Sequence, residues 1–408
     1  MKEALNSSGN THIVNVSVSG KQEVGTWASK IPSAYQAGYE KASALNPDLA
    51  AKYIQHTVVG DPVADAVIEA LAALDHQESH RFINAGMEQD AKVLGEAPRP
   101  LRDFFEEVGS PPAWFDRDAV LRGRHAFQQH LDLFIPAFVV VTLRNFTSLM
   151  SKVFLMTGQV TTQEGVRRIR QNIRYLVEMI MLPNALDRQG ESWKFTVRLR
   201  LMHAEIRRRL RTSGQWDEAV YGAPISAANM ALASANFSAS LIRDAERLGA
   251  NLTADARAGI MQIWRYASWL IGTPEILLFD GDEAETTEFA RIAHLCEPPP
   301  NQESVMTSNA VVYLLPEVAK LTDRAAKRSM VEHVYRVSRA LLGDELADQL
   351  KFPRQRTAGL LPWLRCKRRL SGAFGGLAPR MVGKWRADPF ALLLDATMID
   401  NLRCRLHG

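Results

Sequence analysis

Length, composition and charge place the chain among ordinary globular proteins. Its 408 residues are 46% apolar and 23% charged, which argues against a disordered, fibrous or membrane-embedded chain. A formal charge of +4, from 49 basic and 45 acidic residues, does not indicate a nucleic-acid binder. The three cysteines show no CxxC spacing, so they predict neither a disulfide framework nor a thiolate zinc site.

The sequence carries no recognisable export or membrane signal. The first twenty residues lack an apolar segment after a basic one, as a secretory signal would require. The longest apolar stretch, residues 131–143, is interrupted by Asp132 and Pro136 and is shorter than the ~20 residues that cross a bilayer. We therefore expect a cytoplasmic protein without a transmembrane segment.

Apolar residues recur at helical spacing along most of the chain. Residues 1–54 lack a sustained period and predict a loosely ordered lead-in, whereas Pro62 opens a clear helical pattern. Further helices are expected at residues 119–130, 135–157, 164–182, 193–210, 226–248, 254–270, 282–294, 308–320 and 325–342. No segment alternates with period two for long, so the prediction is an all-α fold.

The proline triplet after Glu297 is the best candidate for a domain boundary, because three prolines cannot continue a helix. We predict a single large helical domain at residues 55–296 and a helical C-terminal extension, residues 297–408, packed on its core. The extension includes a basic stretch, residues 365–384, and an apolar helix-like segment, residues 389–402.

His203 lies on the apolar stripe of its predicted helix, next to Leu199, Ile206 and Leu210 at helical spacing. A neutral imidazole in such surroundings can act as an axial iron ligand, because iron needs one nitrogen lone pair in a dry pocket. The same spacing also fits a core histidine whose nitrogens are satisfied by the backbone. The pattern alone leaves both interpretations open.

Polar residues around His203 have two interpretations as well. Arg207 belongs to a dense basic helix that could pair with the carboxylates of a cofactor, or could form a solvated cationic face. On the preceding helix, Arg168, Asn172 and Tyr175 lie at i, i+4 and i+7, so they could point into one pocket or mark an amphipathic boundary. No dinucleotide, P-loop, zincin or α/β-hydrolase motif is present.

Several segments together resemble the family of rubber oxygenases (latex-clearing proteins) and MpaB-like oxygenases. They are GDPVAD at residues 60–65, PAWFD at 112–116, Thr157-Gly158, WKFTVRLRLMHAEIR at 193–207, and Trp264-Arg265-Tyr266 followed by Leu270-Ile271-Gly272. The arginine-rich stretch ending in MHA is the most specific of them. The resemblance spans roughly residues 55–295.

The resemblance implies haem b in a globin-like helical core, with His203 as proximal iron ligand and Leu199 and Arg207 in the cofactor site. The implied activity inserts dioxygen into a carbon–carbon double bond of an isoprenoid. The distal arginine, lysine and threonine of the rubber-cleaving relatives fall on Arg168, Gln171 and Asn172, so only the arginine is kept. The distal glutamate of those relatives has no counterpart between Arg144 and Gln163.

We therefore expect a haem-dependent oxygenase whose catalytic residues are Arg168, Gln171 and Asn172 and whose partners are a hydrophobic small-molecule alkene and dioxygen. Two other hypotheses stay open: a haem-binding carrier or sensor without oxygenase activity, and a haem-free helical binding module.

Overall fold

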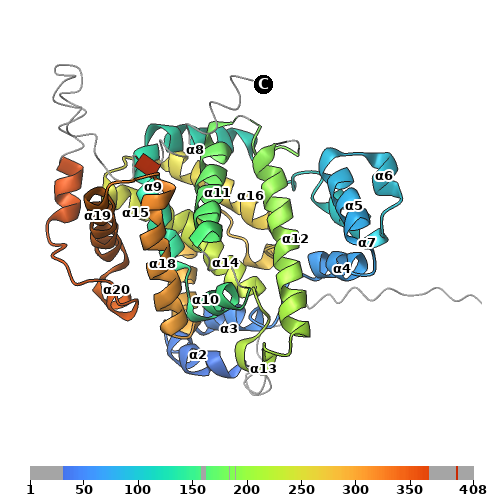
Figure 1. Cartoon of the computed structure of the whole chain (residues 1–408), viewed down its shortest axis with the longest axis horizontal. Coiled ribbons are helices and arrows are strands. Elements are labelled where there is room, and N and C mark those ends of the chain that lie inside the picture. Colours follow the sequence, from blue (N-terminus) through green and yellow to red (C-terminus); the bar gives the residue numbers. More distant parts are fainter. Residues whose placement is uncertain (1–30, 158–161, 183, 189, 367–391, 394–408) are drawn as a thin grey trace, which may run out of the picture.

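The computed structural model describes residues 31–157, 162–182, 184–188, 190–366 and 392–393, which form helices joined by loops (Figure 1). No strand occurs among the residues described. The predicted all-α fold is therefore confirmed. The basic stretch at residues 365–384 and the segment at 389–402 lie outside the described residues, apart from 365–366 and 392–393.

The helices follow one another as α2 (Gln36–Ser43), α3 (Pro47–Gln55), α4 (Pro62–Leu71), α5 (His76–Glu88), α6 (Ala91–Gly95), α7 (Arg99–Glu107), α8 (Arg117–Gln129), α9 (Leu131–Arg144), α10 (Ser148–Met156), α11 (Thr162–Met181), α12 (Glu191–Thr212), α13 (Glu218–Tyr221), α14 (Ala227–Ala235), a π-helical turn (Asn236–Ser240), α15 (Leu241–Leu248), α16 (Ala254–Leu270), α17 (Glu283–Cys296), α18 (Gln302–Val318), α19 (Arg324–Leu342) and α20 (Asp344–Gln349). Short 3-10 turns occur at Ser33–Tyr35 and Glu275–Leu277.

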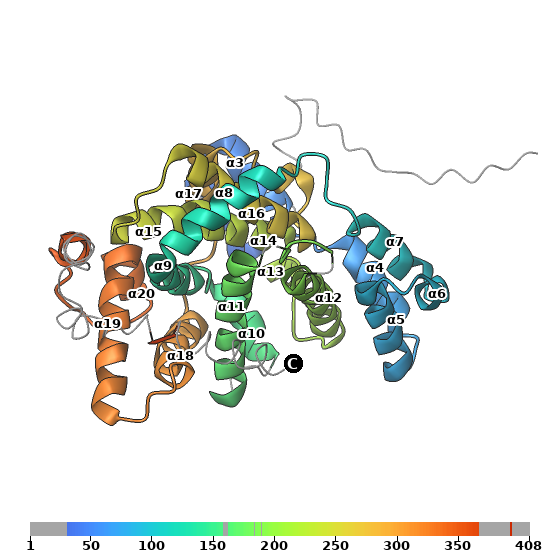
Figure 2. The ribbon, with the colours of Figure 1, turned by 90° about the horizontal axis from the view of Figure 1, so that it is seen from above.

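The main core lies around the crossing of α8 and α16, where two glycines let the helix backbones touch. A Cβ atom on Gly123 would lie 2.3 Å from the carbonyl carbon of Gly259, so a larger residue would push the helices apart. Apolar side chains from α9, α11, α15, α18 and α19 complete this core. Figure 2 shows α8 crossing above α16, with α11 and α12 running beside each other.

Helices α4 to α7, residues 62–107, form a lobe at one edge of the molecule, which we call the α4–α7 lobe (Figures 1 and 2). Its apolar residues build a separate core together with one face of α12. Asp61 caps α4 by accepting a hydrogen bond from the backbone of Ala64, and Pro62 occupies the first helical position. Helix α12 therefore lies between this lobe and the rest of the protein.

Among the residues that the structure describes, 31–54 differ from the loosely ordered lead-in expected for residues 1–54. From Ser33 onward the chain forms α2 and α3, whose apolar side chains share a core with α14 and α17. Tyr35 and Tyr53 are fully buried, and the Tyr53 hydroxyl donates a hydrogen bond of 2.6 Å to Glu297 Oε1. Only a few residues of α2 and α3 are buried. Apolar residues therefore do not recur regularly enough there to predict helices packed in a core.

The proline triplet after Glu297 does not separate two cores. Helices α18 and α19, which follow it, contribute to the same core as α9 and α16. Glu297 is itself buried, and its backbone leaves the helical conformation at the end of α17. The prolines therefore redirect the chain within one body, and the C-terminal extension as far as residue 366 is part of that body.

Two segments expected to be single helices are interrupted. The helix predicted for residues 135–157 breaks between α9 and α10, where Thr147 Oγ1 accepts a hydrogen bond from the backbone of Met150. The helix predicted for residues 226–248 contains the π-helical turn between α14 and α15. Neither a threonine cap nor a π-turn interrupts the apolar periodicity enough to be seen in the sequence.

Within the described part of the chain, no single helix has both the length and the apolar composition to cross a bilayer. Helices α8 and α9 meet the criterion only as a pair, and they are bent by 98° where they join.

Candidate functional site

Helix α12 presents two different faces. One face buries Trp193, Val197 and Leu201 in the core of the α4–α7 lobe. The other carries Leu199 and His203, which are partly buried, and Ile206, which packs with Val153 of α10. His203 therefore lies on the side of α12 that faces away from the lobe.

His203 is held as a neutral imidazole. Burial lowers its pKa to about 3, and the positive charges of Arg207 and Arg168 act in the same direction, opposed by Asp61. Its Nδ1 atom is enclosed and has no hydrogen-bond partner in the described structure. At Nδ1, therefore, His203 is not a core histidine whose nitrogen is satisfied by the backbone. An enclosed polar atom without a partner requires an explanation.

Helix α11 places Arg168 across from His203. The Arg168 side chain is partly buried and lies 5.0 Å above the Phe154 ring. Burial lowers the pKa of its guanidinium, and the charge of Glu164, four residues earlier, opposes this shift. Arg168 is thus a poorly solvated cation near a neutral imidazole.

The two helices touch at one end of this region. The Tyr175 ring of α11 packs against Phe195 of α12 at 4.9 Å, and its hydroxyl lies 3.0 Å from Thr196 Oγ1. Burial raises the pKa of Tyr175 to about 12, so the phenol stays protonated. The contact fixes α11 against α12 near the start of α12.

The predicted polar residues do not all meet in one pocket. Arg168 and Tyr175 face α12, as described above, but the Gln171 and Asn172 side chains are exposed on α11. Leu199 is partly buried one helical turn before His203. Arg168, Asn172 and Tyr175 do lie along one side of α11, as their spacing predicts, but Asn172 is at the edge of that side that faces solvent.

Arg207 has contacts that differ from the expected pairing with a cofactor carboxylate. Its Nε donates a hydrogen bond of 2.6 Å to Asp65 Oδ1, and Nη1 donates to the backbone oxygen of Ile225. Only Nη2 is enclosed without a partner. Arg200 is likewise buried and pairs with Asp61. These two arginines thus belong to the interface with α4, and not to a solvated cationic face.

The sequence showed no sign that Asp61 and Asp65 are the partners of these arginines. Both acids stand in the GDPVAD segment, in which only Pro62 was identified as the start of a helical pattern. Pairing across more than a hundred residues leaves no local pattern.

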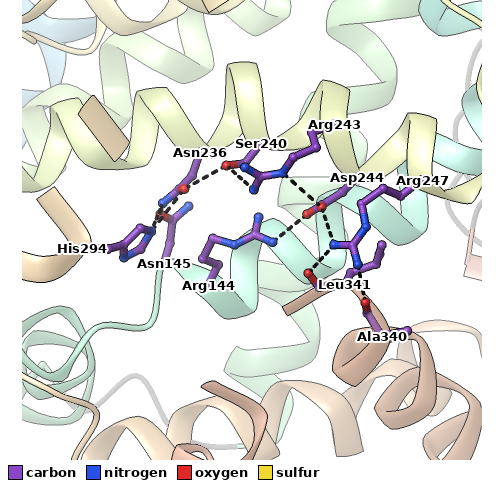
Figure 3. A network of polar contacts seen from close by, with 10 residues as sticks. All are labelled: Arg144, Asn145, Asn236, Ser240, Arg243, Asp244, Arg247, His294, Ala340 and Leu341. Atoms are coloured by element: carbon purple, nitrogen blue, oxygen red, sulfur yellow. Dashed lines mark hydrogen bonds and ion pairs between the residues drawn. The ribbon is translucent and has the colours of Figure 1, made fainter. Parts of the chain in front are cut away.

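A second histidine of similar character lies in the main body, on α17. Burial also lowers the pKa of His294 to about 3, with Arg144 and Arg243 acting in the same direction. Its Nε2, however, lies 3.2 Å from the amide nitrogen of Asn236 in the π-turn. Asn236 in turn bonds to Asn145, and the network continues through Ser240 to Arg243 and Asp244 (Figure 3).

The residues around His203 fit a haem group. A neutral ring nitrogen is the form that binds iron, and the enclosed Nδ1 has no other partner. Leu199 supplies apolar surface beside it, and Arg168 supplies a poorly solvated cation. No group of three or more histidine, cysteine or acidic residues that could hold a metal ion occurs in the described ranges, so a metal there would need ligands beyond the protein.

The fold and the site define an all-helical protein with one unpartnered imidazole facing an arginine on the neighbouring helix. The chain belongs to the family described as ER-bound oxygenase mpaB/B'/rubber oxygenase, catalytic domain, whose profile matches residues 127–371, more than half of the 408 residues. The resemblance inferred from the sequence motifs is thereby confirmed. The matched region includes Arg168 and His203 and continues across Glu297.

The structure is also similar to a solved structure of latex clearing protein in the closed state. The TM-score is 0.56, with 19% sequence identity over 84% of this chain and 91% of the other. At this identity the likeness shows the fold alone. No curated protein matches the chain in sequence. Membership of an oxygenase family supports an oxidoreductase.

Proposed function

We propose that the chain is a haem b-dependent oxygenase that cleaves a carbon–carbon double bond of a hydrophobic, isoprenoid-like substrate. Dioxygen would give one oxygen atom to each carbon of the double bond, so that two carbonyl groups form and no further reductant is consumed. The observation that carries the proposal is the neutral His203 imidazole with an enclosed, unpartnered Nδ1, in a member of an oxygenase family.

Each predicted residue has a role that its surroundings support. His203 would hold the iron through a ring nitrogen, Leu199 would contact the apolar face of the porphyrin, and Arg207 retains one free donor, Nη2, for a propionate. When bound, haem supplies the iron at which dioxygen is activated.

Arg168 would stabilise negative charge that develops on the reacting oxygen atoms. A fixed cation in a water-poor site does this better than water, because it needs no reorganisation and is weakly screened. The exposed amides of Gln171 and Asn172 would contact the substrate on the solvent side of α11. The partly buried Phe195 and exposed Met202 add apolar surface on α12 for a hydrophobic chain.

Oxygen uptake and carbonyl formation by the haem-loaded protein, measured with a panel of small isoprenoid alkenes, test the proposal. We expect Arg168→Gln to keep haem and to slow turnover by about a hundredfold, as the loss of one donor to a developing oxyanion does elsewhere. Arg167→Gln is the matched control, because Arg167 precedes it on α11 and makes only an exposed ion pair with Glu164.

Haem that binds to the protein without any oxygen uptake or carbonyl product across the panel would overturn the oxygenase proposal. That result would instead favour a haem carrier or sensor. Equal turnover of Arg168→Gln and Arg167→Gln would remove Arg168 from the catalytic residues.

A further inference from the structure

Two ion pairs flank His203 on α12, one on each side of it along the helix. Arg200, three residues before His203, binds Asp61 with two hydrogen bonds, Nε to Oδ2 at 2.7 Å and Nη2 to Oδ1 at 3.1 Å. The side chains of Arg200 and Asp61 are only 4% and 8% exposed. The Phe104 ring lies 5.1 Å below the Arg200 guanidinium, and Glu107 accepts a further bond from Nη1.

Arg207, four residues after His203, forms the second pair. Its Nε lies 2.6 Å from Asp65 Oδ1, and its side chain is 2% exposed. Arg211, one turn further along α12, binds the other oxygen of Asp65 at 3.2 Å. Both acids come from the start of α4, so one short segment of the α4–α7 lobe holds three consecutive turns of α12.

Two glycines leave the space that these pairs occupy. A Cβ atom on Gly272 would lie 2.1 Å from Asp61 Oδ2 and 2.6 Å from Arg200 Nε. A Cβ atom on Gly60 would lie 2.9 Å from both Arg207 Cδ and Asp65 Oδ2. Three of the motif segments in the sequence, at residues 60–65, 193–207 and 270–272, therefore meet at these two pairs.

The opposite side of α12 contributes apolar contacts before and after His203. Phe195 packs against Tyr175 two turns before His203, and Ile206 packs with Val153 of α10 one turn after it. Between them, Leu199 is only partly buried and Met202 is 37% exposed. A change of one residue in the register of a helix turns each side chain by about 100° around its axis. The ion pairs with α4 consequently act together with these apolar contacts in setting which way the imidazole faces.

We propose that Asp61 and Asp65 are positioning residues that orient His203: acting through Arg200 and Arg207, they fix the rotation of α12 so that the imidazole faces Arg168 on α11. This inference rests on the proposed function, because the orientation serves a purpose if His203 binds iron. Charge-assisted arginine pairs, of which Arg200–Asp61 is bidentate, suit the task, since their geometry is more restricted than that of apolar packing.

The first test uses the haem-free protein, so that it does not depend on cofactor binding. The rate at which diethyl pyrocarbonate modifies His203 is measured by peptide mass spectrometry in wild type, Asp61→Asn and Asp65→Asn. We expect modification of His203 to become about tenfold faster in both variants, because α12 then samples rotated states. Asp103→Asn is the control, since Asp103 lies in the same lobe in an exposed pair with Arg99.

Circular dichroism verifies that each variant is folded. If Asp61→Asn does not fold, Gly60→Ala takes its place, because one methyl group 2.9 Å from Arg207 Cδ disturbs the pair without removing a charge. Asp65→Glu, which keeps a carboxylate, should recover most of the wild-type rate. Unchanged reactivity of His203 in folded Asp65→Asn and Gly60→Ala proteins would overturn the proposal.

The second test adds haem and records the absorption bands that report axial ligation. We expect Asp65→Asn to bind haem at least about tenfold more weakly and to lose the histidine-ligated spectrum, with recovery in Asp65→Glu. If wild type binds no haem while His203 reactivity still responds to both acids, the proposed function fails and the positioning role stands. If haem ligation and reactivity are both unaffected, the positioning role fails alone.

Discussion

The sites of His203 and His294 differ in one respect that decides their interpretation. Both imidazoles are partly exposed as residues, both are neutral with a pKa of about 3, and both lie near two arginines. His294 bonds to Asn236 within a continuous polar network (Figure 3), whereas Nδ1 of His203 is enclosed without a partner. Burial and a low pKa are common to both histidines, and the missing partner is the feature on which the proposal of His203 as a ligand rests.

The comparison also separates two ways of holding charge inside the protein. Around His294, Asp244 is fully buried, pairs with Arg144 at 2.8 Å, and lies within 4 Å of Arg243 and Arg247. Around His203, the acids Asp61 and Asp65 pair with Arg200 and Arg207, and the charge of Glu164 on α11 acts on Arg168. Arg144 Nη1 and Asp244 Oδ1 in the network around His294 also lack hydrogen-bond partners, but only that network supplies its imidazole with one.

The largest expected effect comes from removing the buried charge of Asp244 from the network around His294. We expect Asp244→Asn to lower the free energy of unfolding by about 3–5 kcal/mol, because Arg144 would then remain buried without a counter-charge. Chemical denaturation measures the change. Haem binding should be unaffected, and a folded Asp244→Asn protein of wild-type stability would show that this network is not what holds the region together.

Apolar replacements of the two histidines should act in opposite directions. We expect His294→Leu to cost about 1–3 kcal/mol, because it removes one hydrogen-bond partner of the buried Asn236 amide. His203→Leu should leave the stability of the haem-free chain unchanged or raise it by about 1 kcal/mol, because it removes an enclosed, unsatisfied nitrogen. Equal losses in the two variants would contradict the distinction between the sites.

A pH series sharpens the comparison further. Both histidines have a pKa near 3 in the folded chain, against an ordinary value of 6.5. As the pH falls from the ordinary value towards 3, the unfolded chain takes up protons that the folded chain does not, so stability decreases. Each histidine should contribute a slope of up to about 1.4 kcal/mol per pH unit.

The contribution is isolated by difference, because many carboxylates also titrate in this range. Each leucine variant should show a shallower loss of stability between about pH 6 and pH 4 than wild type. Stability that declines with the same slope in wild type and variant would mean that the replaced histidine is already protonated in the folded chain.

The smallest effects are expected at the exposed polar residues of α11. We expect Gln171→Ala and Asn172→Ala to change the free energy of unfolding by less than about 0.5 kcal/mol, because both side chains are exposed. Any change in turnover should appear in KM for the alkene, because these residues would contact substrate only. A loss of haem in either variant would place them inside the cofactor site instead.

Much of the fold follows from the sequence because apolar periodicity records burial. The helix predicted at residues 254–270 coincides with α16, and the helix carrying His203 is longer than predicted by only two residues at each end. The interruption between α14 and α15 was not predicted, since the π-turn is stabilised by Asn145 and His294 from distant segments. The burial of the N-terminal segment was not predicted either, because Tyr35 and Tyr53 share a core with the distant helices α14 and α17.

The candidate site is harder to predict from the sequence than the fold. Spacing correctly predicts that His203 and Leu199 share a face of α12, but the sequence alone cannot show which face of α12 packs on the α4–α7 lobe. The decisive contacts join Arg200 to Asp61 over 139 positions and Arg207 to Asp65 over 142 positions. Such pairing depends on the packed arrangement of α4 against α12, which no local pattern records.

The central claim is that the His203 imidazole binds the haem iron. A haem titration followed by absorption spectroscopy, in wild type, His203→Gly and His294→Ala, tests it most directly. We expect wild type and His294→Ala to bind haem with the same histidine-ligated spectrum, and His203→Gly to lose that spectrum and regain it with added imidazole. Identical haem spectra in all three proteins would contradict the claim.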